Sequence, residues 1–197
     1  MQPEPLPDPT DEALMKRVCA GDEPALGVLM VRWEVPLKRF LYRLLLNSAE
    51  AEDLAQETFV KLFLKRATFR DGAKFSPWIL TIAANLARNR RRWWVRHPTR
   101  SLDVAAPDGT ARPMWEPADS AVGPAEHLVR GERAAAVRGA VAALPHELRE
   151  VVVLAEFEER SHPEIAEVLG CTAKAVEMRL YRARERLRKT LGRPGAD

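Results

Sequence analysis

One stretch of the sequence decides the fold, PEIAEVLGCTAKAVEMRL at residues 163–180. Its first half places Ile165, Ala166 and Leu169 on one helical face, at spacings of one, three and four residues. Gly170 suits the left-handed conformation that ends a helix, because glycine has no Cβ to be penalised there. Thr172 suits the N-cap of a second helix, where a hydroxyl accepts an orphan amide hydrogen. The stretch therefore predicts a helix-turn-helix.

The second helix of this pair, over about residues 172–188, is strongly basic. Its cationic residues are Lys174, Arg179, Arg182, Arg184, Arg186 and Arg188. Val176 and Leu180 face inward four residues apart, which directs Arg179, Arg182 and Arg186 toward solvent or phosphate. The plain alternative is a solvated helix face with charge pairs such as Glu185 with Lys189. A glycine turn, a cap and a basic helix that agree with one another favour DNA binding, because such a helix fits the major groove.

Composition and local charge point to a nucleic-acid partner. The chain has 197 residues, 46% hydrophobic and 30% charged, enough for one good core or two small ones. The net charge is only +3, yet residues 88–100 contain six arginines and no acidic residue. No apolar run reaches the roughly eighteen residues of a membrane span. The N-terminus also lacks the pattern of a signal peptide, so we expect a cytoplasmic protein.

The cysteines and histidines predict no disulfide, metal site or cofactor. Cys19 and Cys171 lie far apart in sequence, in two different predicted domains. The four histidines form no ligand spacing with either cysteine. Both cysteines are interpreted as small apolar fillers.

Helical periodicity divides the chain into two all-α domains joined by a flexible linker. The predicted boundaries are a tail over 1–10, a first domain over 11–97, a linker over 98–124, a second domain over 125–191 and a tail over 192–197. The linker segment has five prolines, two glycines and no apolar period. No alternating β pattern is present, so the fold class is all-α.

The first domain is expected to hold four helices. Thr10 caps a helix that runs to Cys19, and Asp22 starts a longer one. That longer helix carries an apolar stripe, predicted to be core: Leu26, Leu29, Met30, Trp33, Leu37, Phe40, Leu41 and Leu44. A third helix begins after Ser48, with Leu54, Thr58 and Leu62 on its inner side. A fourth runs over about 77–95, with Pro77 in its first turn.

This fourth helix begins apolar and ends cationic. Asn85, Arg88, Asn89 and Arg92 form a polar line at spacings of three and four. Aromatic rings and amides among arginines suit an unpaired nucleic-acid strand, because rings stack on bases and amides bind base edges. For Trp78 a core role and a binding role are equally supported. The alternative for the tryptophans at 93 and 94 is that they are partly buried anchors.

Several segments together resemble a known family. AEDLAQETFVKLF (51–63), FRDG (69–72) and WILTIAAN (78–85) are similar to region two of bacterial sigma factors of the extracytoplasmic-function (ECF) group. LPHELREVVVL (144–154) and the helix-turn-helix resemble region four of the same factors. The resemblance covers about residues 11–97 and 125–191. It implies a subunit that binds RNA polymerase and directs promoter-specific initiation, without catalysis.

The resemblance also implies roles for individual residues. Asp53, Gln56 and Glu57 match positions that dock on the clamp helices of the polymerase β′ subunit; contact with the β subunit is also expected. Asn85 matches the position that binds a flipped base of the minus-ten element. The same resemblance assigns further contacts to minus-ten DNA, namely Trp78, Arg88, Asn89 and Arg92. In region four it assigns contacts to the minus-thirty-five element, namely Lys174, Glu177, Met178, Arg179, Arg182 and Arg184. An anti-sigma factor is an expected partner.

Two residues differ from the family pattern, and two other functions are weighed against the sigma-factor prediction. Glu177 and Met178 stand where many relatives have a basic and a hydroxyl residue, so the base preference does not transfer. A stand-alone helix-turn-helix regulator that binds DNA as a dimer is the alternative function, but the chain offers no evident dimerisation helix. A nucleic-acid-processing enzyme would need a constellation of carboxylates, metal ligands or a nucleophile, and the sequence presents none.

Overall fold

The computed structural model describes residues 8–97 and 124–192, with residues 124–132 described as backbone only. Within these ranges every regular element is helical, which confirms the all-α class. Each of these helices is also too short or too polar to cross a bilayer. The predicted linker and most of the predicted tails lie outside the described residues.

The first domain contains the four predicted helices and one short 3-10 turn. They are α1 (Asp11–Cys19), α2 (Glu23–Leu45), α3 (Ser48–Lys65), η1 (Arg66–Thr68) and α4 (Phe75–Arg96). The predicted caps are confirmed, because Thr10 accepts from the amide of Ala13 and Asp22 from that of Ala25. The third helix begins one residue earlier than expected, since Asn47 is its cap.

The apolar stripe of α2 forms most of the core of this domain. Leu29, Leu37 and Phe40 are fully buried, and α3, whose inner side includes Thr58, packs against them. The hydroxyl of Thr58 donates to the carbonyl of Leu54, so this polar group is buried at little cost. The prediction was wrong for Met30, which is 41% exposed.

The second domain contains the helix-turn-helix. Its elements are α5 (Pro124–Ala142), α6 (His146–Val152), the π-helical turn η2 (Val153–Phe157), α7 (His162–Leu169) and α8 (Ala173–Leu191). Gly170 has φ +63°, in the left-handed region, and Thr172 accepts from the amide of Ala175. Val176 and Leu180 are buried as predicted. The turn between α7 and α8 therefore forms for the reasons that the sequence suggested.

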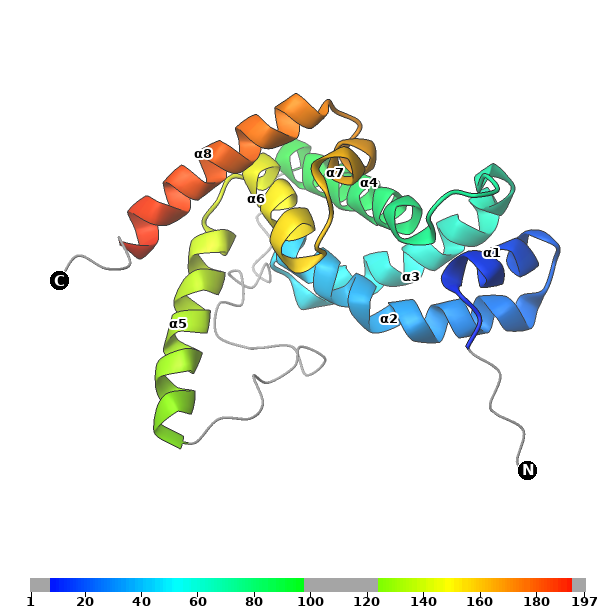
Figure 1. The fold of residues 1–197 in the computed structure, drawn as a ribbon, viewed down its shortest axis with the longest axis horizontal. Helices are drawn as coiled ribbons and strands as arrows, with labels where there is room; N and C mark the ends of the chain where they lie inside the picture. Colours follow the sequence, from blue (N-terminus) through cyan, green and yellow to red (C-terminus); the bar gives the residue numbers. More distant parts are fainter. Residues whose placement is uncertain (1–7, 98–123, 193–197) are drawn as a thin grey trace.

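The two domains pack directly against one another. In Figure 1, α7 lies over α4, while α8 and α5 extend away from the first domain. The guanidinium of Arg149 in α6 donates to the carbonyl of Leu44 at the end of α2, at 2.9 Å. The composition of residues 98–124 predicted a flexible linker between two domains, and it carried no signal for the contact between them.

Candidate nucleic-acid interface

The N-terminal half of α4 is anchored by an aromatic cluster. The ring of Trp78 lies 5.2 Å from that of Phe69 and 6.3 Å from that of Phe75, and Trp33 completes the cluster from α2. Edge-to-face contacts of this kind stabilise the loop that precedes α4. Trp78 is half-buried, so a core role is evident and its predicted contact with minus-ten DNA stays a prediction.

The polar line on α4 forms as the spacing predicted. Asn85 is exposed, and its side-chain oxygen accepts from Arg88 at 2.7 Å. One turn further on, Asn89 accepts from Arg92 in the same way. The two amides are thus held in place by the arginines that follow them by three residues. Both pairs present amide and guanidinium groups side by side on one helix face.

Arg88 has a second set of partners in the other domain. It donates to the carbonyl of Leu169 at 3.1 Å, the last residue of α7. It also lies 3.8 Å from the carboxylate of Glu150 in α6. Carbonyls at the C-terminus of a helix attract a cation, because they have no partner within the helix. No local sequence signal predicts this contact, since the two residues are 81 positions apart.

A groove of about 480 Å³ lies between α4 and the second domain. Its lining residues include Asn85, Arg88, Arg91, Arg92, His146, Glu150, Glu167 and Leu169. Burial raises the pKa of Glu150 to about 7 and, together with nearby arginines, lowers the pKa of His146 to about 4. Both groups are almost inaccessible to solvent and 3.7 Å apart. Burial therefore disfavours charge on both of them at the floor of this groove.

The exposed side of α8 carries most of the predicted duplex-binding residues. Lys174 and Glu177 form an ion pair at 2.8 Å, and this hydrogen bond lowers the pKa of Glu177. Met178 is 43% exposed. Arg184 pairs with Glu156 at 3.1 Å. Glu177 is therefore a charged carboxylate that offsets Lys174.

Two details of α8 differ from expectation. Arg179 is half-buried and lies close enough to Glu150 to influence its charge, so it is less available to phosphate than Arg182 and Arg186, which are exposed. Glu185 pairs with Arg188 rather than with Lys189. Residues three apart and four apart are both neighbours on a helix, so spacing alone does not choose between these two partners.

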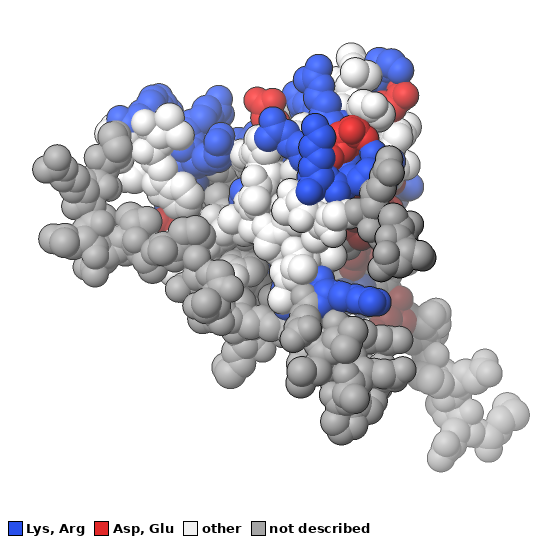
Figure 2. Space-filling view, turned by 90° about the vertical axis from the view of Figure 1, so that its left-hand side faces the viewer, with Lys and Arg blue, Asp and Glu red and all other residues white. Residues whose placement is uncertain are grey.

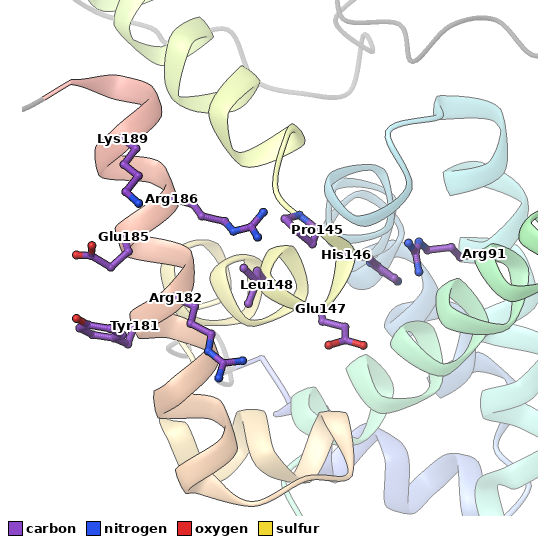
Figure 3. Close-up of a pocket in the computed structure, with 10 residues that line it drawn as sticks. All are labelled: Arg91, Pro145, His146, Glu147, Leu148, Tyr181, Arg182, Glu185, Arg186 and Lys189. Atoms are coloured by element: carbon purple, nitrogen blue, oxygen red, sulfur yellow. The ribbon is translucent and has the colours of Figure 1, made fainter.

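A second groove of about 520 Å³ lies between α8, the start of α6 and α4. Figure 3 shows Arg182 and Arg186 directed from α8 toward the first turn of α6, with Arg91 entering from α4 on the other side. Glu147 lies between them. The same end of the molecule presents clustered Lys and Arg side chains in Figure 2. Basic residues of both domains thus gather on one face.

The predicted polymerase-binding residues lie on α3. Asp53 and Gln56 are exposed and Glu57 is half-buried. Next to Gln56 is an apolar groove of about 630 Å³ between α2 and α3. Its apolar lining comprises Leu26, Met30, Ala55, Phe59, Val60, Phe63 and Leu64. Sequence reasoning missed this groove; the signal was the apolar character of positions 60, 63 and 64, outside the inner side of α3.

Only one of the two cysteines is packed as the sequence predicted. Cys171 is half-buried against the core, as a small filler would be. Cys19 is exposed, and its thiol contacts the carbonyl of Arg66 at 3.1 Å, so it is not a filler. In the described parts of the chain, no three His, Cys, Asp or Glu side chains gather as metal ligands would.

Comparison with known proteins gives two family matches within the chain. Residues 29–94 match the Sigma-70 region 2 family, and residues 134–187 match Sigma-70, region 4. The RNA polymerase sigma-H factor of Pseudomonas aeruginosa is 33% identical, over 92% of this chain and 93% of that protein. The ECF RNA polymerase sigma factor SigW of Bacillus subtilis is 34% identical, over 90% of this chain and 94% of that protein.

Two solved structures have similar folds. CnrH in complex with the cytosolic domain of CnrY superposes with a TM-score of 0.64 at 26% identity, over 92% of this chain and 96% of that chain. The sigma factor RpoE of Bartonella quintana, in complex with the anti-sigma factor NepR, gives 0.67 at 23% identity, over 84% and 95%. These matches extend across both domains.

Proposed function

The chain belongs to the sigma-70 family and is an RNA polymerase sigma factor of the ECF group, and we propose that its two domains divide promoter recognition between them. The first domain, region two over 11–97, docks on the polymerase core and holds the melted minus-ten strand. The second, region four over 125–191, binds the minus-thirty-five duplex. The observation that carries this proposal is that both family matches occur in one chain, in the order of full-length relatives.

Core docking is assigned to the exposed face of α3. Asp53, Gln56 and Glu57 supply the polar contacts to the β′ clamp helices, and region four is expected to contact the β subunit. The apolar groove beside Gln56 gives this surface an apolar neighbour that a partner helix can cover. Charged side chains at its rim would then set orientation more than affinity.

Minus-ten recognition is assigned to α4. Asn85 receives the flipped base, since an exposed amide can both donate to and accept from a base edge. Arg88, Asn89 and Arg92 lie along the same face and hold the strand through its phosphates, while Trp78 supports the pocket. Region four would contact the upstream duplex through α8, with Lys174, Glu177, Met178, Arg179, Arg182 and Arg184 at or near the DNA.

Other features of the proposal follow from family membership. The protein acts without catalysis of its own and is expected in the cytoplasm, where polymerase is. An anti-sigma factor is the expected inhibitor; the CnrH structure is a complex with the cytosolic domain of CnrY, and the RpoE structure is a complex with the anti-sigma factor NepR. A stand-alone dimeric regulator is not favoured, because it leaves the region-two match unexplained.

Promoter-directed transcription tests the proposal. Bacterial core polymerase is mixed with the full chain and genomic DNA fragments, and the 5′ ends of the transcripts are sequenced. We expect start sites downstream of a shared pair of elements, absent without the chain. The double variant D53A/Q56A should abolish them, whereas K65A, which changes an exposed residue at the end of the same helix, should not. Transcripts that do not depend on the chain would refute the proposal.

A further inference from the structure

The last turns of α4 carry an aromatic pair to which the proposed function gives no role. The indole of Trp93 and the imidazole of His97 are stacked, with ring centroids 5.0 Å apart and planes inclined by 25°. The Nδ1 atom of His97 lies 3.1 Å from the backbone carbonyl of Trp93. Since a carbonyl oxygen only accepts, Nδ1 donates in this hydrogen bond and holds the imidazole over the indole. The pair is therefore an ordered part of the helix end.

Of the two adjacent tryptophans in α4, one is a buried anchor and the other is not. Trp94 is half-buried and packs against the hydrophobic core. Trp93 is 48% exposed, and His97 is exposed as well. Core packing thus explains Trp94 but not the stacked pair, whose rings remain accessible to a ligand.

The stacked pair continues the row of side chains assigned to the minus-ten strand. Asn85, Asn89, Trp93 and His97 follow one another at intervals of four residues, so each lies next to the previous one on the helix surface. All four are exposed. The row begins with two amides and ends with two aromatic rings. A strand that passes the two amides along this row reaches the ring pair next.

The surroundings of the pair are basic. Residues 88–97 include five arginines and no acidic residue. One of them, Arg92, is exposed and precedes Trp93 directly, and it donates to the amide oxygen of Asn89. Arginines bind phosphates, and aromatic rings stack on bases. An apolar protein partner fits this surface less well, because the cations beside the rings would have to be desolvated.

We propose that Trp93 and His97 form a second base site on α4, in which an unpaired base of the promoter strand stacks on the ring pair. The proposal rests on the proposed function of α4 and extends it from base edges, bound by Asn85, to base faces. Asn85 and Trp93 are eight residues apart, or about 12 Å along the helix at about 1.5 Å per residue. A stacked strand covers this distance in about three to four nucleotides, at about 3.4 Å each.

Stacking gives this second site a role different from that of the first. Every base has a face on which a ring can stack, so the ring pair adds affinity for the melted strand with little preference for sequence. The amide of Asn85 binds base edges and supplies the preference. The ring pair therefore holds the strand unpaired next to the position at which it is recognised.

Photochemical coupling tests whether a base reaches the pair. The probe is a twelve-residue oligothymidine in which 5-iodouracil replaces one thymine, at each position in turn. Iodouracil couples on irradiation to an aromatic side chain stacked on it, and digestion with mass spectrometry identifies the residue in the full chain. We expect adducts at Trp93 or His97. Adducts confined to other residues, such as Trp78, or no adduct at concentrations that saturate binding, would overturn the proposal.

Two substitutions separate base stacking from a merely structural role at the helix end. W93L removes the ring and keeps an apolar side chain, whereas W93F keeps a ring. We expect W93L to bind labelled oligothymidine at least about fivefold more weakly than the wild type, and W93F to lose about twofold or less. V95A alters another exposed apolar residue of the same turn and should bind as the wild type does. Unchanged binding by W93L together with a lower Tm would mean that the pair only stabilises α4, and would overturn the proposal.

Salt dependence distinguishes a base face from a phosphate as the contact. W93L removes no charge, so the slope of log K against log salt should stay that of the wild type. R92A removes a cation beside the ring pair and should flatten the slope by about 0.7. A slope flattened by W93L as much as by R92A would mean that the ring acts by positioning an arginine, which contradicts stacking.

The stacking site and the proposed function can fail separately. Promoter-specific transcripts, with no adduct at Trp93 or His97, would refute base stacking and leave the sigma-factor mechanism intact. Adducts at the pair without such transcripts would support the stacking site and refute the promoter assignment.

Discussion

Lys174 and Glu177 are joined by a hydrogen bond of 2.8 Å in the first turn of α8, at the end of the helix predicted to enter the major groove. Both side chains are more than half exposed. The carboxylate therefore shields the cation that would otherwise face phosphate, and it repels phosphate itself. This pair determines the electrostatics at the tip of the helix.

Replacement of this carboxylate should strengthen binding to duplex DNA. Glu177→Gln leaves Lys174 fully charged, so we expect tighter nonspecific binding and a slope of log K against log salt that is steeper by about 0.9. Fluorescence anisotropy with a labelled duplex over a salt series measures both. Glu23→Gln removes a carboxylate from the exposed start of α2 and is the control. An affinity equal to that of the control would place this turn of α8 away from the DNA.

One variant in α4 and one in α3 should affect different steps, promoter opening and binding to core polymerase. Asn85→Ala removes the base-binding amide, so the fraction of open promoter complex should fall about tenfold or more while core affinity changes little. Asp53→Ala should do the reverse, weakening core binding by about fivefold or more. Permanganate reactivity of the minus-ten strand reports opening, and fluorescence titration with core polymerase reports docking. Equal losses in both assays for Asn85→Ala would contradict the base-pocket role.

Glu150 should make stability depend on pH near neutrality. Its pKa is about 7 in the folded chain, against 4.5 for an exposed glutamate. The folded chain therefore holds a proton that the unfolded chain releases in this window, and the free energy of unfolding falls as pH rises from about 4.5 to about 7. The change approaches 1.4 kcal/mol per pH unit, or about 3 kcal/mol in all.

His146 acts in the opposite direction, so a difference measurement is needed. Its pKa is lowered from 6.5 to about 4, and its contribution to stability rises with pH between those values. The two effects oppose each other from about pH 4.5 to 6.5. Urea unfolding of the wild type and of Glu150→Gln between pH 5 and 8 isolates Glu150, because His146 is present in both proteins. The compared quantity is the free energy of unfolding of the wild type minus that of Glu150→Gln. If it does not decrease toward pH 7, Glu150 holds no proton in the folded chain.

Replacement of glycine by alanine should have opposite effects on stability at two positions. At Gly170, with φ +63°, a Cβ meets nothing within 4 Å, so the cost of Gly170→Ala is backbone strain of about 1 kcal/mol. Gly27 lies inside α2, and there too a Cβ has open space. Gly27→Ala should therefore stabilise the chain by about 0.5–1 kcal/mol, because alanine favours helix. Thermal unfolding of both variants tests this, and destabilisation by both would mean that the turn conformation is not the cause.

Local sequence signals were sufficient for most elements of the fold. Thr10, Asp22, Thr172 and Gly170 begin or end helices as predicted, because capping and the left-handed turn depend on residues within four positions. The polar line from Asn85 to Arg92 also follows from helical spacing alone. Met30 was misassigned, since periodicity identifies an apolar face but not how much of that face another helix covers.

The sequence by itself determined the helices, the turn between α7 and α8, the basic character of α4 and α8, and the family. Only the tertiary structure decided that Arg88 binds the end of α7 and that Glu150 is buried with a raised pKa. The apolar groove beside Gln56 also exists only once α2 and α3 are packed. The physical reason is distance along the chain: helix signals act within one or two turns, whereas burial and charge at a site are set by segments that meet only on folding.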